Sequence, residues 1–145
     1  MPHEQALAEK CADAMMAADN ASRAMGMHIE EVAPGFAVLS MQVRSDMING
    51  HDTCHGGIIF TLADSAFAFA CNSYNQVSVA AAAEISFLKP ALLDDVLTAT
   101  SREIFRGGRN GIYDTRVTNQ NGDVIAEFRG KSRTIKGTLV EEETP

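Results

Sequence analysis

An aspartate lies inside one of the most apolar stretches of the chain. Asp64 stands in the run IIFTLADSAFAFAC (58–71), where its neighbours are mostly small, aliphatic or aromatic. A carboxylate that is removed from water needs a compensating partner or a chemical use. Asp64 is therefore a candidate functional residue. The alternative is an exposed or capped carboxylate on the solvent side of a helix.

The residues just before this stretch are suited to binding negative charge. His55, Gly56 and Gly57 precede a helix expected at about 58–73. The first N–H groups of a helix lack intrahelical partners and carry the positive end of its dipole. Because glycine has no side chain, an oxyanion or carbonyl oxygen can approach these donors closely, as an oxyanion hole requires. The alternative is that the two glycines only make a tight turn.

The spacing of these groups bears on the assembly of the molecule. Eight residues separate Gly56 from Asp64, which places them about 12 Å apart along a helix and roughly 80° apart around it. Two such groups of one chain cannot easily serve the same small reacting centre. If both are catalytic, the site lies between two antiparallel copies of the helix. A catalytic role for both groups therefore requires a dimer.

Other reactive residues gather before the helix. His51, Cys54 and His55 form an H-x-x-C-H cluster, but zinc needs a further ligand, and His3 and His28 are distant in sequence. Cys54 next to His55 suggests a thiolate nucleophile, yet adjacent side chains rarely face each other and no third orienting group is evident. We therefore predict no metal. Cys54 is interpreted as a packed residue, and His55 as a residue that fixes the turn by hydrogen bonding.

Composition limits the classes of function. The chain has 145 residues with 46% hydrophobic and 21% charged residues, which is typical of one compact domain. Its formal charge of -7 disfavours nucleic acid and anionic membrane surfaces as partners. Three cysteines without framework spacing, together with a start that lacks a signal-peptide pattern, favour a cytoplasmic protein with reduced thiols. No apolar run is long enough to span a membrane.

The order of elements predicts an α+β domain over residues 1–145. Period-2 and period-3.6 patterns and turn signals divide the chain. They predict a helix at about 4–25, short strands at 28–32 and 36–43, the helix at 58–73, long strands at 76–89, 95–105, 112–119 and 124–135, and a frayed tail at about 137–145. The simplest packing places one central helix against one antiparallel sheet.

Several motifs together resemble one family. They are Asn49, HGG (55–57), LADSAFAFACNS (62–73), ISFLKPA (85–91) and RGKS (129–132). Their combination is similar to the hotdog-fold acyl-CoA thioesterases, especially the phenylacetyl-CoA thioesterases of bacterial phenylacetate degradation. The resemblance extends from about residue 25 to residue 136.

The resemblance implies a curved sheet wrapped around the long helix, and subunits that pair into dimers and then tetramers. It implies that the N–H of Gly57, with that of Gly56, polarises the thioester carbonyl. Asp64 would come from the opposing subunit as general base or direct nucleophile, and Asn49 would orient the carbonyl or the attacking water. Coenzyme A is part of the substrate, and no cofactor is expected. Some relatives hold the water with Ser or Thr on the next strand, where this chain has Ala80 to Ala83.

Binding an acyl-CoA needs cations for the phosphates and an apolar pocket for the acyl group. The available cations are Lys89, Arg106, Arg109, Arg129, Lys131 and Arg133, and the last three share one face of the final strand. Met47 and Ile48 before Asn49, with Phe67 and Tyr74 from the helix region, are the candidate pocket residues. For each residue, the alternative is a plain core position or a solvated strand face.

Two rival functions remain at the level of sequence. A hydratase or dehydratase of the same fold resembles this chain in outline but uses a histidine on or near the central helix, and residues 58–73 contain none. A non-catalytic acyl-CoA sensor would carry a DNA-binding segment, and the first 25 residues are too few and too acidic to provide one. Hydrolysis of an aryl-acetyl-CoA is the leading hypothesis.

Overall fold

A computed structural model describes residues 2–142 of the chain. Its sheet is antiparallel, with the strand order β1-β2-β4-β5-β6-β3. The elements are α1 (Pro2–Ala18), α2 (Asn20–Ala24), β1 (His28–Ala33), β2 (Phe36–Gln42), a 3-10 turn (Ser45–Met47), α3 (Gly56–Cys71), β3 (Ser78–Phe87), β4 (Val96–Gly107), β5 (Asn110–Thr118) and β6 (Val124–Thr134). The predicted α+β class is confirmed.

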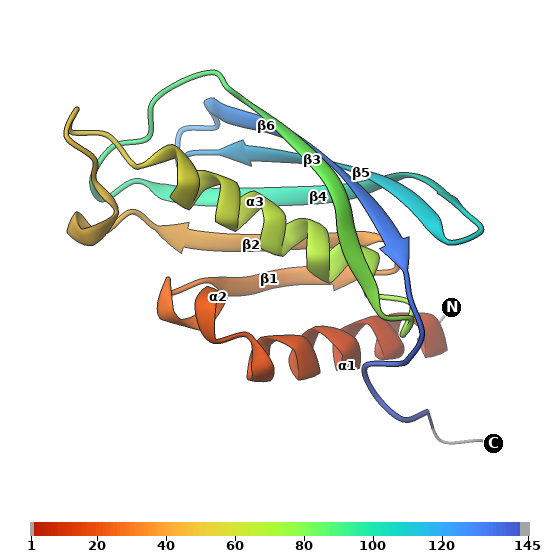
Figure 1. The fold of residues 1–145 in the computed structure, drawn as a ribbon. Helices are drawn as coiled ribbons and strands as arrows, with labels where there is room; N and C mark the ends of the chain where they lie inside the picture. The colour runs from red at the N-terminus through yellow and green to blue at the C-terminus, as the bar shows by residue number, and fades with distance from the viewer. Residues whose placement is uncertain (1, 143–145) are drawn as a thin grey trace.

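The sheet curves around α3, as Figure 1 shows. The helix packs mainly against β2, β4 and β5. Phe67 of α3 lies against Tyr113 of β5 and Phe128 of β6, with ring centroids 5.7 and 5.8 Å apart. Gly130 of β6 allows this close approach, because a Cβ there would lie 2.8 Å from the Phe67 ring. The hotdog arrangement implied by the resemblance is therefore present, with its one long central helix and an additional N-terminal helix.

The N-terminal segment is divided into two helices, whereas the sequence pattern predicts one helix over residues 4–25. Asp19 separates α1 from α2 and has a non-helical backbone (φ -91°, ψ 87°). Its carboxylate accepts a hydrogen bond from the N–H of Ser22 at 2.9 Å and so caps α2. Aspartate is a favoured N-cap because it satisfies a backbone donor that the helix leaves free. Periodicity alone does not reveal such a break.

The C-terminal tail is attached further than the sequence pattern predicts. The side chain of Asn75 accepts hydrogen bonds from the N–H groups of Leu139 and Val140 and donates one to the Val140 carbonyl. The prediction of a frayed tail from residue 137 is therefore wrong as far as Val140. Residues 143–145, which the same prediction included, lie outside the described part of the chain.

Candidate functional site

The start of α3 has one capped and one free backbone donor. His55 is the N-cap residue, and its Nδ1 accepts a hydrogen bond from the Gly57 N–H at 2.9 Å. The His55 carbonyl accepts from the Ile58 N–H at 2.9 Å. Within residues 2–142, the Gly56 N–H has no hydrogen-bond acceptor. The resemblance places Gly57 first among the two donors, but in this geometry Gly56 is the residue whose N–H a carbonyl oxygen can use.

The ring of His55 has a defined hydrogen-bonding state in this arrangement. Since Nδ1 accepts a hydrogen bond from the Gly57 N–H, it carries no proton itself, so the ring proton lies on Nε2. The side chain is exposed. His55 therefore holds the turn at the helix start through a side-chain cap, which is the hydrogen bonding that its place in the sequence suggests.

A groove lies beside Gly56. A Cβ added at Gly56 would lie 3.1 Å from Cζ of Phe87, so glycine allows the aromatic ring to approach the helix start. The groove has a volume of about 350 Å³. It is lined by Asn49, Thr53, Cys54, Gly56, Ile59, Phe87, Leu88, Lys89 and Pro90. The apolar residues after β3 are absent from the predicted pocket, although the ISFLKPA motif contains them.

Asn49 organises the loop on one side of this groove. Its Oδ1 accepts hydrogen bonds from the backbone N–H groups of His51 and Thr53 and from the Thr53 hydroxyl, at 2.9, 3.3 and 3.3 Å. Within the described chain its Nδ2 group has no acceptor. Asn49 therefore shapes the loop with its oxygen, and its role in orienting a carbonyl or water stays a prediction.

Asp64 lies on the part of α3 that this chain leaves open. Gly57, Thr61, Asp64 and Ala68 are three or four residues apart and form one stripe. None of them is buried, whereas most of the remaining positions in α3 are. Asp64 is about 10 Å along the helix from Gly57 and on nearly the same side. Gly57 and Asp64 therefore both face any ligand or second chain that binds on this stripe.

The surroundings of Asp64 make its carboxylate more basic. Burial raises its pKa, and the nearby charge of Asp19 raises it further. No hydrogen bond or ion pair joins Asp64 to another residue within 2–142. The sequence offers two explanations for this carboxylate, a compensating interaction partner or a chemical use. The described residues supply no such partner. Perturbed carboxylates of this kind are typical of functional sites.

Strand β3 forms an unpaired edge close to the open stripe. It pairs with β6 on one side only. Residues 79–84 are exposed although most of them are apolar, and the register shifts between Ala80 and Ala82. No hydroxyl lies between Val79 and Glu84. The Ser or Thr that some relatives carry there has no counterpart on this part of the strand.

Two of the predicted pocket residues, Phe67 and Tyr74, do not reach the groove. Phe67 is 1% exposed and belongs to the core. Tyr74 lies beyond the C-terminal end of α3, where its hydroxyl donates to Glu103 at 2.8 Å. Neither side chain lines the groove beside Gly56 of the same chain, because Phe67 is packed in the core and Tyr74 follows the opposite end of α3.

The other two predicted pocket residues, Met47 and Ile48, lie under the loop that precedes α3. Met47 is buried, and its carbonyl accepts a hydrogen bond from the His55 N–H at 2.8 Å. Ile48 forms an isolated antiparallel bridge with Cys54. These two residues therefore support the loop beneath the groove, and neither belongs to the groove lining.

The predicted phosphate contacts of the β4–β5 turn lie far from the groove. Arg106 stacks on the Tyr74 ring, with its guanidinium carbon 3.7 Å from the ring centroid. Arg109 lies exposed in the same turn. Tyr74 follows the C-terminal end of α3, whereas the groove lies at its start, so this cation pair belongs to the opposite end of the helix.

The cations of β6 share one face of the strand, as its periodicity predicts. Lys131 and Arg133 are exposed, and so is Arg129. Arg129 is already paired with Asp114 at 2.6 Å. Lys131 and Arg133 are therefore the more available pair for a phosphate group.

A further cation lies at the groove itself. Lys89 belongs to the groove lining. Its ammonium group forms an ion pair with Asp123 at 2.7 Å, and both side chains are partly exposed to solvent. An exposed ion pair of this kind contributes little to stability and can exchange its partner. Lys89 is thus the predicted cation that lies nearest to Gly56.

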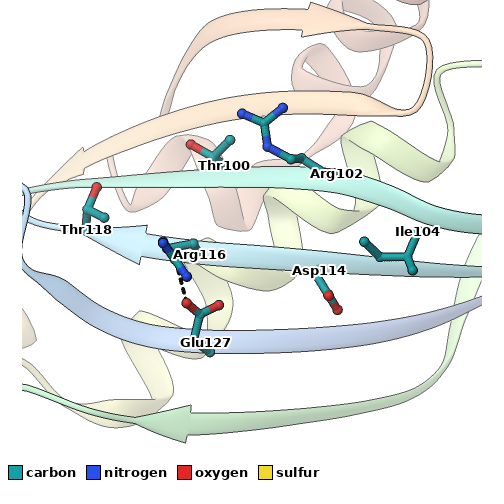
Figure 2. Close-up of a pocket in the computed structure, with 7 residues that line it drawn as sticks. All are labelled: Thr100, Arg102, Ile104, Asp114, Arg116, Thr118 and Glu127. Carbon is teal, nitrogen blue, oxygen red and sulfur yellow. Dashed lines mark hydrogen bonds and ion pairs between the residues drawn. The ribbon is translucent and has the colours of Figure 1, made fainter.

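A second hollow lies on the outer face of the sheet, away from α3 (Figure 2). Its residues come from β4, β5 and β6, and Arg116 and Glu127 form an ion pair across it. The remaining lining residues are Thr100, Arg102, Ile104, Asp114 and Thr118. The sheet separates this hollow from Gly56 and Asp64, so it contains none of the predicted catalytic groups.

The H-x-x-C-H cluster is dispersed. His51 is exposed in the loop, Cys54 is buried with its pKa raised by desolvation to about 11, and His55 caps the helix. Among residues 2–142, no group of three His, Cys, Asp or Glu side chains comes together. In the same residues, no helix is long and apolar enough to cross a membrane.

Comparison with known proteins identifies the family. Residues 51–126 match the thioesterase superfamily. The chain is 46% identical over 131 residues to the acyl-coenzyme A thioesterase PaaI of Escherichia coli K12, covering 90% of this chain and 94% of that protein. The chain belongs to the thioesterase superfamily and, as a member, is a thioester hydrolase.

Solved structures agree with this assignment. The structure of the E. coli PaaI protein from the phenylacetic acid degradation operon superposes with a TM-score of 0.91 at 45% identity, covering 92% of this chain and 97% of that one. A mutant of the phenylacetic acid degradation protein PaaI from Thermus thermophilus gives a TM-score of 0.78 at 32% identity, covering 81% of this chain and 100% of that one. The family resemblance of the sequence motifs is therefore confirmed.

Proposed function

We propose that the protein hydrolyses aryl-acetyl-CoA thioesters, phenylacetyl-CoA or its ring-hydroxylated forms, to the free acid and coenzyme A. Two observations on residues 2–142 carry this proposal: the helix-start N–H of Gly56 has no acceptor there, and Asp64, on the open stripe of α3, has a raised pKa and no partner among these residues. The names of the E. coli and T. thermophilus relatives support the phenylacetate substrate class. The reaction uses water and no cofactor beyond the coenzyme A of the substrate.

The site is completed by a second copy of the chain. Gly56 and Asp64 of one chain are about 12 Å apart along α3, too far to act on one carbonyl. In a dimer, the edges of two β3 strands pair and the open stripes of two antiparallel α3 helices face each other. The Gly56 end of one helix then meets Asp64 of the other. We further propose that two such dimers form a tetramer and that the protein acts in the cytoplasm.

The chemistry follows from this arrangement. The thioester carbonyl oxygen accepts a hydrogen bond from the Gly56 N–H, and the helix dipole stabilises the negative charge that develops on it. The Asp64 carboxylate of the other chain then either removes a proton from the attacking water or attacks the carbonyl carbon itself. In both routes the carbon–sulfur bond breaks and coenzyme A leaves as the thiol. Asn49, which lines the groove, orients the carbonyl or the water with its Nδ2 group.

The test is release of free thiol from a panel of acyl-CoAs. Wild type and Asp64→Asn are assayed side by side with aryl-acetyl, benzoyl, short-chain and long-chain alkyl substrates. We expect turnover concentrated on aryl-acetyl-CoA, and a loss in Asp64→Asn of several orders of magnitude, since both routes need the carboxylate. Tight binding without thiol release by the folded wild type would instead indicate an acyl-CoA-binding protein. An enoyl-CoA in the panel, followed by its absorbance, tests the hydratase alternative.

The two routes are separated by isotope. In a single turnover in water enriched in oxygen-18, direct attack places the label in the Asp64 carboxylate when water cleaves the acyl anhydride at Asp64. Label in Asp64 therefore demonstrates direct attack. Label in the acid product alone shows that water attacked the acyl carbon, as it does when Asp64 acts as a general base.

A further inference from the structure

A second carboxylate is fixed beside the catalytic helix. Asp19, at the junction of α1 and α2, accepts hydrogen bonds from Ser22 with both oxygens: Oδ1 from the backbone N–H at 2.9 Å and Oδ2 from the hydroxyl at 2.6 Å. Ser22 is 1% exposed. Because both oxygens have a partner on a buried residue, the position of the Asp19 carboxylate is defined by the fold.

This carboxylate is connected to α3 through two hydroxyl groups. The Ser22 Oγ and the Ser65 Oγ lie 2.8 Å apart. The Ser22 hydroxyl has one proton, which it donates in the hydrogen bond to Asp19. Ser65 must therefore be the donor in the hydrogen bond to Ser22. The hydrogen bonds therefore run in one direction, from Ser65 through Ser22 to the Asp19 carboxyl group. Ser65 directly follows Asp64 in the sequence and is buried, so this series of hydrogen bonds holds the Asp19 carboxylate against the turn of α3 that carries Asp64.

The charge of Asp19 reaches Asp64. After burial, Asp19 is the group that raises the pKa of Asp64. Cys71 of the same helix is the other titratable neighbour, and desolvation raises its thiol pKa to about 12, so it is uncharged at neutral pH. Among residues 2–142, no cation from the elements packed on α3 pairs with Asp64. The negative charge beside Asp64 is thus left without compensation inside one chain.

We propose that Asp19 is a positioning residue for the reaction: tethered by Ser22 and Ser65, it keeps a negative charge next to Asp64 and strengthens Asp64 as a proton acceptor. This inference rests on the proposed thioesterase mechanism. A stronger base nearer the working pH raises the rate of proton removal from water. The proposed role of Asp19 also explains the break between α1 and α2, because this break places the Asp19 side chain against α3.

Two neutral replacements test the charge while keeping the helix cap. Asn and Ser are both good N-cap residues, so Asp19→Asn and Asp19→Ser retain an acceptor for the Ser22 N–H. The matched control is Asp13→Asn, which removes the same charge from an exposed position of α1. For each protein, kcat and kcat/KM for phenylacetyl-CoA are measured across pH.

We expect the acidic limb of the pH–rate profile, where activity falls as pH is lowered, to shift in the Asp19 variants. Both Asp19 variants should lose activity at lower pH than the wild type, because Asp64 without its like-charged neighbour stays ionised further into acid. On the wild-type acidic limb they should therefore be faster than the wild type, while kcat on the alkaline plateau should fall because the base is weaker. Asp13→Asn should leave the limb in place. A purely structural role for Asp19 would lower the rates at all pH values without moving the limb.

A spectroscopic titration separates this inference from the proposed function. Carbon-13 NMR of the Asp64 carboxyl, assigned with Asp64→Asn, should show a lower midpoint in Asp19→Asn than in the wild type. An unchanged midpoint and an unchanged limb in an active enzyme would overturn the role of Asp19 alone. If the wild type hydrolyses no acyl-CoA, the thioesterase mechanism fails, and the positioning role proposed here fails with it. The NMR midpoint would then still report whether the two carboxylates interact.

Discussion

At the scale of single residues, His55 determines which backbone amide at the start of α3 is available. Its ring accepts a hydrogen bond from the Gly57 N–H at 2.9 Å, so the Gly56 N–H is the donor that the proposed mechanism uses. Gly56 is the first residue of α3, and proline is well tolerated at the first helical position because its missing N–H would have no helical partner. Gly56→Pro therefore removes the proposed oxyanion donor with little cost to the helix.

We expect Gly56→Pro to lower kcat by about 10²- to 10³-fold, the usual effect of removing one oxyanion donor. Gly56→Ala is the matched control, because it keeps the N–H and adds only a methyl group 3.1 Å from Phe87. Phe87 is 53% exposed and can move aside. Steady-state kinetics of both variants, with circular dichroism for the fold, distinguish loss of the donor from steric crowding. Equal losses in the two variants would contradict the role of the Gly56 N–H.

The basicity of Asp64 also has a consequence for stability. Its pKa in the folded chain is raised by burial, so the folded state holds the proton more tightly than the unfolded state. The free energy of unfolding contributed by this group therefore decreases as pH rises from the unfolded pKa through the folded one. We expect Asp64→Asn to be more stable than the wild type at neutral pH, with the difference vanishing in acid. Denaturant unfolding at several pH values measures it.

At the scale of elements, the contact between α3 and β6 depends on a glycine of the RGKS motif. A Cβ at Gly130 would lie 2.8 Å from three atoms of the buried Phe67 ring. Gly130→Ala should therefore destabilise the fold by about 1–3 kcal/mol, as overpacking in a core does. Thermal unfolding tests this expectation. Gly50→Ala is the control, since a Cβ there meets nothing within 4 Å.

The sequence pattern predicts which elements form but not which way α3 faces. The strands, the long helix and its place against the sheet follow from periodicity and turn residues, and the structure agrees with them to within a few residues at most boundaries. The phase of α3 does not follow, because its open stripe (Gly57, Thr61, Asp64 and Ala68) includes small residues like those on its buried sides. For this reason the pattern does not reveal that Phe67 lies on the buried side of α3, away from the groove beside Gly56 of the same chain.

The details of the site depend on tertiary contacts that a local pattern does not contain. Asp64 and the glycine pair stand out because a charge in an apolar run and two glycines at a helix start are unusual. The capping of Gly57 by His55 depends on a ring orientation, and the tether from Asp19 to Ser65 joins residues far apart in sequence. Phe87 meets Gly56 only because β3 ends at the helix start.

At the scale of the whole molecule, the proposed site shared between two chains makes a prediction that no single-chain mechanism makes. Asp64→Asn homodimers lack the carboxylate in both sites, and Gly56→Pro homodimers lack the donor in both. In a mixed dimer, one site contains both changes, but the other contains an intact Gly56 from one chain and an intact Asp64 from the other. After random subunit exchange of equal amounts, about half of the dimers are mixed and each has one good site. Activity should recover to about a quarter of the wild-type value.

The mixing experiment is controlled by placing both changes in one chain. When a chain with Asp64→Asn and Gly56→Pro exchanges with an equal amount of wild type, each site of a mixed dimer lacks one group, so only pure wild-type dimers remain active. Activity should then fall on exchange from about half to about a quarter of the value for the same amount of wild-type protein. If each site were contained within one chain, the activity would instead stay at about half of the wild-type value after exchange.

Subunit exchange must be verified independently, for instance by mass spectrometry of intact dimers. Otherwise, failure of activity to recover could also mean that the subunits did not exchange. If the two single variants remain inactive after verified exchange, both groups act within one chain. The separation of about 12 Å along α3 would then have to be closed by a change in the helix itself, because α3 as it stands holds the two groups apart.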